Sequence, residues 1–172
     1  MVENKKLYLI NLNRKEYIEL TFLPKISSLA VLYWLIADIK DAEEYKTPGT
    51  WKNNKIVILA QENNTLLIQY TVFYSSQKKE IIVGDYSEEY WQLLKHIKYY
   101  KNITNQTLKE IKKYIKRKGL PLDTLSPLKV PGFQDINLWP GKDNKYYATS
   151  GVFINLEYLE KIFPPKTSKQ PT

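Results

Sequence analysis

The sequence predicts a single α+β domain with a mostly antiparallel sheet, and three observations carry this prediction. Residues 55–61 and 65–74 are rich in β-branched and aromatic side chains and are separated only by Glu-Asn-Asn. Because Asn tolerates positive φ, this spacing favours a tight hairpin. Residues 28–40 predict one buried helix, and residues 87–118 predict two amphipathic helices.

The other predicted strands are shorter. Residues 5–12, KKLYLINL, alternate well enough to predict a strand with Leu7, Leu9 and Asn11 on one face, and residues 16–22 either continue this strand or form a second one. Residues 80–83 predict a strand after the hairpin, and residues 151–156 predict a last strand before a short helix.

The helices have recognisable starts and stops. Ser27 or Ser28 is the expected N-cap of the buried helix, whose side chains are apolar on nearly every side. Ser87 is the expected cap of the second helix, where the apolar stripe is Tyr90, Leu94 and Ile97. The third helix is predicted over 105–118, with an apolar stripe of Leu108, Ile111 and Ile115 and a stop at Gly119 and Pro121.

Length and composition fit one globular domain. A chain of 172 residues can bury a hydrophobic core, and 43% hydrophobic with 26% charged residues argues against general disorder. We expect the domain to span residues 1–163, and residues 164–172, PPKTSKQPT, to form a disordered tail.

The positive charge is concentrated in one segment. The formal net charge is +8, and residues 95–118 hold nine Lys and Arg against the single acid Glu110. The rest of the chain is therefore balanced. A basic block on a neutral body indicates a directional electric field, which favours a polyanionic partner.

The third helix presents most of this charge on one side. At 100° per residue from Leu108, four lysines fall between roughly 40° and 140°, Arg117 falls near 180°, and the apolar stripe lies at roughly 300° to 0°. The candidate polyanion-binding residues are Lys109, Lys112, Lys113, Lys116 and Arg117. Tyr99, Tyr100 and Tyr114 could stack on unpaired bases.

An alternative explains the same pattern as the solvated face of a helix in a lysine-rich chain. The basic segment is also nearly all lysine. Arginine is the residue that recognises bases and phosphates in a fixed bidentate geometry, so this composition favours the alternative. If the helix binds nucleic acid, we expect contact with the backbone and no sequence preference.

The irregular segment 131–147 is the second candidate binding region. Its aromatic candidates are Phe133, Trp139, Tyr146 and Tyr147, which either anchor a partner protein or pin the loop to the domain.

No catalytic, metal or cofactor site is predicted. The chain has no cysteine, which excludes thiolate catalysis and cysteine-based metal centres, and His96 is its only histidine. The acids between Asp38 and Glu44 lack the spacing of a calcium loop, and the turn 83–87 is followed by acids that would repel a phosphate. An enzyme whose carboxylates meet only in three dimensions remains an alternative.

The expected location is intracellular and soluble. The N-terminus lacks a signal-peptide pattern, and the longest apolar run, residues 29–37, is much shorter than the ~20 residues that a bilayer crossing needs. No membrane partner is therefore expected.

Two stretches carry a resemblance to a group of proteins. YLINLNRKEYIEL near the N-terminus and WKNNKIVILAQEN, with Trp51 before an Ile/Val strand, resemble the openings of uncharacterised small proteins of protists and large DNA viruses. This chain has Asn53-Asn54 where that group has Gly-Asp after the Trp. The resemblance implies no activity. The Lys, Ile, Asn and Tyr content also fits an AT-rich genome.

The leading functional hypothesis is a non-enzymatic binding or accessory module that contacts another protein through residues 131–147 or the basic helix. The alternative is non-specific nucleic-acid binding through the basic helix.

Overall fold

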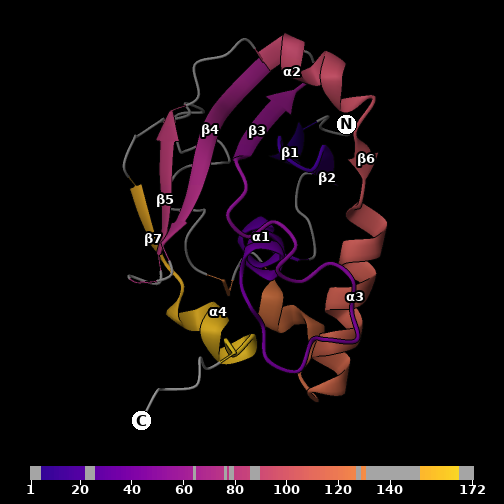
Figure 1. The fold of residues 1–172 in the computed structure, drawn as a ribbon, viewed down its shortest axis with the longest axis vertical. Helices are drawn as coiled ribbons and strands as arrows, with labels where there is room; N and C mark the ends of the chain where they lie inside the picture. Colours follow the sequence, from indigo (N-terminus) through magenta and orange to yellow (C-terminus); the bar gives the residue numbers. More distant parts are fainter. Residues whose placement is uncertain are drawn as a thin grey trace.

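The fold is described by a computed structural model for residues 5–21, 26–63, 65–75, 77, 80–85, 90–126, 129–130 and 152–166. These residues form a seven-stranded sheet in the order β6-β2-β1-β3-β4-β5-β7, together with four α-helices and one short 3-10 helix (Figure 1). Every strand pair is antiparallel except β2 with β6. The predicted α+β class with a mostly antiparallel sheet is confirmed.

The N-terminal segment forms a hairpin of β1 (Lys5–Asn11) and β2 (Glu16–Thr21). The Asn11 side-chain oxygen accepts hydrogen bonds from the backbone N–H groups of Asn13 and Arg14, both at 2.9 Å, and Lys15 has a positive φ of 56°. The side chain of Asn11 therefore closes the turn. Residues 16–21 form a second strand and do not continue the first.

The predicted hairpin is also present. β3 (Ile56–Glu62) pairs with β4 (Thr65–Ser75), and Asn63 between them has a φ of +54°. β5 (Glu80–Asp85) follows β4, and β7 (Val152–Asn155) pairs with β5 at one edge of the sheet. β6 (Lys101–Asn102) forms the opposite edge.

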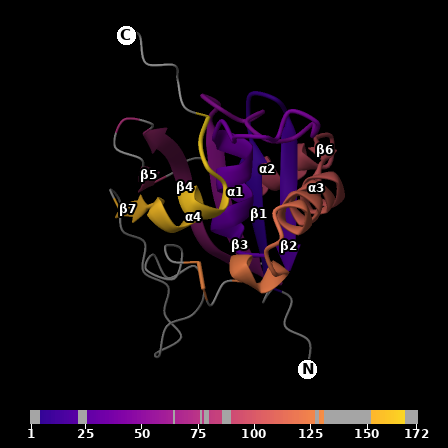
Figure 2. The same cartoon turned by 90° about the horizontal axis from the view of Figure 1, so that it is seen from below.

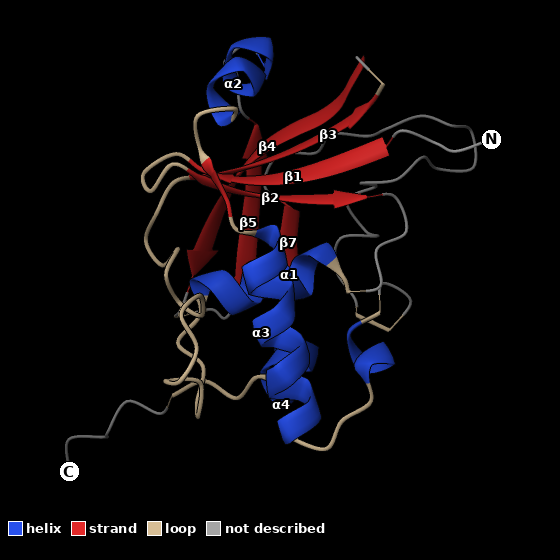
Figure 3. Cartoon of the chain, turned by 90° about the vertical axis from the view of Figure 1, so that its right-hand side faces the viewer, coloured by secondary structure: helices blue, strands red, loops and turns tan. Residues whose placement is uncertain are grey.

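The two faces of the sheet have separate hydrophobic cores. Along β1, Leu7 and Leu9 belong to the larger core, whereas Tyr8 and Ile10 belong to the smaller one. The central strands therefore need apolar side chains on both faces, which explains their nearly continuous apolar runs. Figure 3 shows α2 (Tyr90–Ile97) on one side of the sheet and the other three helices on the opposite side.

The predicted buried helix is α1 (Ser28–Ile36), in which all nine residues are buried. Ser27 is its N-cap and accepts a hydrogen bond from the Leu29 N–H at 3.1 Å. The helix ends before the predicted residue 40, because the Trp34 and Leu35 carbonyls accept hydrogen bonds from Gly49 and Trp51. Figure 2 shows α1 between α4 (Glu157–Ile162) and α3 (Thr104–Arg117).

The basic helix α3 ends in a defined C-terminal motif. Gly119 has a φ of +74°, its N–H bonds to the Lys116 carbonyl, and the Leu120 N–H bonds to the Ile115 carbonyl. This is a Schellman motif, which satisfies the last helical carbonyls and requires a left-handed residue at Gly119. The short 3-10 helix η1 (Leu122–Leu125) follows.

The C-terminal boundary differs from the expectation. Residues 164–166 fall within the predicted disordered tail, but Pro164 accepts a hydrogen bond from the Lys40 N–H and the Lys166 N–H donates to Asp38. Residues 167–172 lie outside the described residues. Across the part of the chain that the structure describes, the helices are all too short or too polar to cross a membrane.

Candidate functional site

The candidate site is the solvent side of α3. Five residues of this helix are buried, namely Thr107, Glu110, Ile111, Tyr114 and Ile115. On a helical wheel they occupy roughly 200° to 340°, and the four lysines at roughly 40° to 140° lie diametrically opposite. The helix docks through one side and turns its lysines directly outward.

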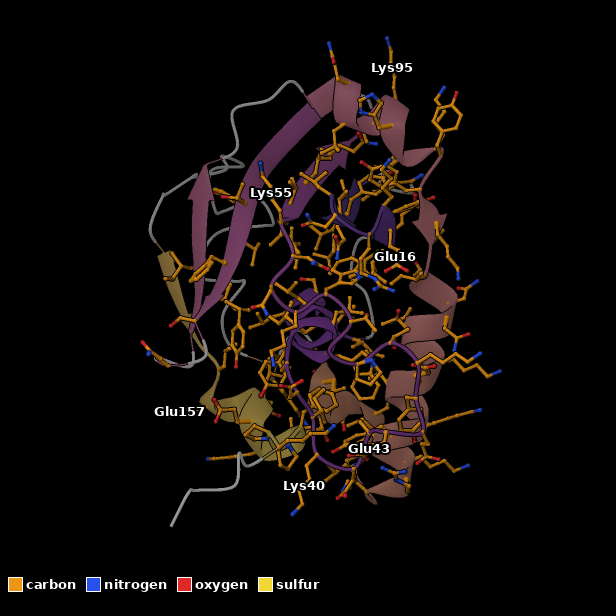
Figure 4. The ribbon with its side chains drawn as sticks, viewed as in Figure 1. Glu16, Lys40, Glu43, Lys55, Lys95 and Glu157 are labelled. Atoms are coloured by element: carbon orange, nitrogen blue, oxygen red, sulfur yellow. The ribbon has the colours of Figure 1, made fainter. Side chains whose placement is uncertain are left out.

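We call Lys109, Lys112, Lys113 and Lys116 the outer face of α3. All four side chains are exposed, and none has an ion pair within the described residues. From Lys109 to Lys116 the helix rises about 10 Å. In Figure 4, nitrogen-tipped side chains project from α3 away from the sheet. Four ammonium groups thus lie on one exposed strip.

Arg117, the fifth predicted residue, is separated from this strip by its contacts. It pairs with the Glu44 carboxylate, donates to the Asp41 backbone carbonyl, and stacks over the rings of Tyr45 and Tyr114. The next residue, Lys118, lies 3.1 Å from the Asp41 carboxylate and lowers the pKa of that carboxyl group. These cations hold the acidic loop after α1 against the helix.

Glu110, the only acid of the basic segment, is buried on the inner side of α3. Its carboxylate accepts hydrogen bonds from the backbone N–H groups of Lys46 and Thr47, from the Thr47 hydroxyl and from the Gln106 amide. Burial by itself would raise the pKa of Glu110, but these donors outweigh it and lower the pKa. The Thr47 hydroxyl also accepts a 2.8 Å hydrogen bond from the Trp34 indole.

We call Glu110, Arg117 and Lys118 the inner flank of α3. Each of them has at least one partner among residues 41–47, so these charges attach the loop to the helix. Glu110 consequently does not neutralise the outer face. Among the described residues, Asp41 and Glu110 are the carboxyl groups with a shifted pKa, and in both the pKa is lowered. A general acid at neutral pH needs a raised pKa.

The exposed basic side chains continue beyond α3. Lys95 and Lys98 near the end of α2, and Lys101 in β6, are exposed and have no ion pair within the described residues. With the outer face they form seven lysines, which we call the basic ridge. Residues 90–109 contain no Asp or Glu. This run without acids is visible in the sequence, and it indicates that the candidate site extends from α3 back to Lys95.

The ridge bends around the edge of the sheet. Leu93 and Ile97 of α2 pack in the smaller core, Ile111 and Ile115 of α3 pack in the larger core, and β6 is the edge strand between them. Figure 4 shows Lys95 at the end of the molecule where α2 lies, while α3 runs along the adjoining side. The seven lysines therefore follow a curved track.

The three tyrosines predicted to stack on bases have different environments. Tyr99 is 85% exposed, Tyr100 is half-buried against the smaller core, and Tyr114 is 0% exposed. The Tyr114 hydroxyl donates to the Lys40 carbonyl at 2.9 Å, and burial raises its pKa to about 12. The prediction for Tyr114 is wrong, because that ring belongs to the packed side of α3.

The remaining predicted features add little to this site. His96 is exposed on α2. The acids of the loop after α1 pair with separate cations, and within the described residues three or more His, Asp or Glu side chains never gather as metal ligands. The aromatic candidates of the 131–147 segment lie outside the described residues: Phe133, Trp139, Tyr146 and Tyr147.

One hollow of about 160 Å³ lies where β4 extends past the start of β3. It is lined by the following residues: Ile36, Trp51, Asn53, Asn54, Ile56, Val72, Phe73 and Tyr74. That volume holds only a few water molecules and is smaller than a typical cofactor or small-molecule site.

No protein-family model, curated protein or solved structure matches this chain significantly. The chemistry of the basic ridge is therefore the basis for a functional proposal.

Proposed function

We propose that this protein is a non-enzymatic binding protein that contacts nucleic acid through the phosphate backbone, using the outer face of α3. The observation that carries the proposal is the set of four exposed lysines that have no ion pair within the described residues and lie directly opposite the buried side of the helix. Such cations bind phosphates by releasing condensed counterions. Lysine acts as a point charge, so the contact reads no bases.

Arg117 is left out of this proposed contact. Its guanidinium is already engaged by Glu44, Asp41 and two aromatic rings, so turning it toward a phosphate would break these contacts. The hypothesis of a partner protein at 131–147 stays a prediction, because that segment lies outside the described residues.

The test is a salt titration of binding to a fluorescent 20-base-pair duplex. An outer face with four contacts predicts a slope of log K against log salt of about −3 to −4. The outer-face variant carries Lys112→Glu, Lys113→Glu and Lys116→Glu. We expect it to lose at least about 100-fold in affinity at 0.1 M salt, because each lost phosphate contact is worth roughly tenfold there.

A matched control variant distinguishes the effect of where the lysines lie on binding affinity from the effect of the net charge. The control variant carries Lys40→Glu, Lys129→Glu and Lys161→Glu, which are exposed residues outside the basic ridge, although Lys129 differs from the outer-face lysines in its ion pair with Asp123. Each replacement lowers the formal charge by two, so both triple variants fall from +8 to +2. Equal losses in the two variants, or a wild-type slope near zero, would refute a localised site.

A further inference from the structure

The basic ridge has a feature that phosphate binding alone does not require, namely the exposed aromatic ring of Tyr99. The turn that carries it is fixed on both sides. The Tyr99 N–H bonds to the His96 carbonyl at 2.9 Å, the Lys101 N–H bonds to Lys15, and the Ile103 N–H bonds to Tyr17. Tyr100 packs on the smaller core and Ile103 is buried, so the backbone holds Tyr99 outward.

The charged side chains nearest to this ring in the sequence are all lysines. Lys95, Lys98 and Lys101 surround it in the chain, and His96 lies one helical turn before it. Glu16 is opposite Lys101 in the strand register, but its carboxylate accepts hydrogen bonds from the Trp51 indole at 2.9 Å and from Arg14 at 3.0 Å. The ring is therefore presented within a field that attracts phosphates.

The shape of the ridge discriminates between ligands. A duplex is stiff, with a persistence length of about 150 base pairs, so it contacts α3 without following the ridge around β6. A single strand is flexible and can contact lysines on both sides of the sheet edge. It also offers unpaired bases, and base stacking on an aromatic side chain is a recurring mode of single-strand binding.

We propose that the ligand class of this site is single-stranded nucleic acid, which follows the basic ridge from α3 to α2 and stacks one base on Tyr99. This inference rests on the proposed function, because it assumes that the outer face of α3 binds phosphates. It adds to the proposed function a preference for single strands over duplexes and a residue, Tyr99, on which one base stacks. The ring supplies stacking area for any base, so the site has no strong sequence preference.

The experiment compares three probes with the full chain: a 20-nucleotide oligothymidylate, a 20-base-pair duplex and an abasic 20-mer that has the phosphates but no bases. The wild-type protein should bind oligothymidylate more tightly than duplex at the same salt. Tyr99→Ala should weaken oligothymidylate binding by roughly 5- to 150-fold, the worth of one base stack, and leave abasic binding unchanged. Tyr99→Phe keeps the ring and should bind like the wild type.

Phe73→Ala is the matched aromatic control, because Phe73 is 64% exposed on β4, outside the ridge. It should bind every probe like the wild type. Lys98→Ala with Lys101→Ala should weaken oligothymidylate binding and leave duplex binding unchanged, since only the single strand reaches that part of the ridge. Lys98 and Tyr99 lie in an exposed turn, and Lys101 lies in an edge strand. The variants at these three positions should therefore remain folded.

The outcomes separate the two proposals. If the outer-face variant loses duplex binding but Tyr99→Ala binds oligothymidylate like the wild type, the phosphate site stands and the single-strand inference is overturned. Equal wild-type affinity for duplex and single strand, or an equal loss on the abasic probe, overturns it too. If the wild-type protein binds none of the probes, the proposed function itself fails.

Discussion

The two sides of α3 carry charges that differ in what holds them. On the inner flank, Glu110, Arg117 and Lys118 each have a partner in the loop of residues 41–47. On the outer face, the four lysines have no ion pair within the described residues. Charged residues of one short helix thus divide into a set that assembles the fold and a set that the fold does not use.

The net charge of a segment therefore does not identify a binding site by itself. Residues 95–118 contain nine basic side chains, but two of them are neutralised by acids from the loop after α1. The other seven are exposed and have no ion pair within the part of the chain that the structure describes. The inner flank should therefore control stability, and the outer face should control binding. Substitutions on the inner flank test the first expectation, and substitutions on the outer face test the second.

The largest stability effect is expected for Glu110→Ala. The substitution leaves the Lys46 and Thr47 N–H groups and the Thr47 hydroxyl without an acceptor, and Glu110 is only 5% exposed. We expect a loss of about 2–4 kcal/mol in the free energy of unfolding, measured by urea denaturation. A loss below ~0.5 kcal/mol would mean that the loop is held by other contacts.

The pH dependence of stability should follow the same carboxylate. The pKa of Glu110 is lower in the folded protein than its ordinary value of 4.5, so the folded state binds fewer protons there than the unfolded chain. Its contribution is present above that ordinary value and is lost as the pH falls through the lowered pKa. Glu110→Gln should flatten the decline in unfolding free energy measured between pH 6 and pH 3.

Asp41 also has a lowered pKa and contributes to the acid dependence of both proteins. The informative quantity is therefore the difference between the wild type and Glu110→Gln at each pH. A difference that stays constant down to pH 3 would show that the charge of Glu110 does not stabilise the loop.

Local patterns were enough to predict the described strands other than β6 and the lysine side of α3, but they did not reveal contacts across the chain. The placement of Leu7 and Leu9 on one face of β1 and the Asn-containing turn after β3 are local signals, and both elements form as expected. The early end of α1 depends on the N–H groups of Gly49 and Trp51, which no helix signal encodes. Gly49 must have a φ of +73°, and an added Cβ would lie 3.2 Å from the Ala37 carbonyl.

The same limit applies to the candidate site. The ion pair of Arg117 could not be predicted, because its partner Glu44 lies far earlier in the sequence. Tyr114 was predicted to stack on bases because the apolar stripe of Leu108, Ile111 and Ile115 looked complete. The buried side is wider, because Glu110 accepts hydrogen bonds from the loop and the Tyr114 ring packs against Trp34 and Phe163.

A smaller effect is expected for Arg117→Ala. Its ion pair is partly exposed and its guanidinium stacks over two aromatic rings, which together predict a loss of about 1 kcal/mol in unfolding free energy. The salt dependence of duplex binding should not change. If the slope instead becomes shallower by about one, Arg117 contacts a phosphate and the boundary between inner flank and outer face is misplaced.

The smallest stability effect is expected for Lys112→Ala, at the centre of the outer face. The side chain is exposed and has no ion pair within the described residues, so the unfolding free energy should stay within about 0.5 kcal/mol of the wild type. The slope of log K against log salt should nevertheless become shallower by about one, because one phosphate contact is lost. Lys161→Ala on α4 is the control and should alter neither quantity. A change in stability with an unchanged slope would mean that Lys112 serves the fold, and the division between the two sides of α3 would no longer hold.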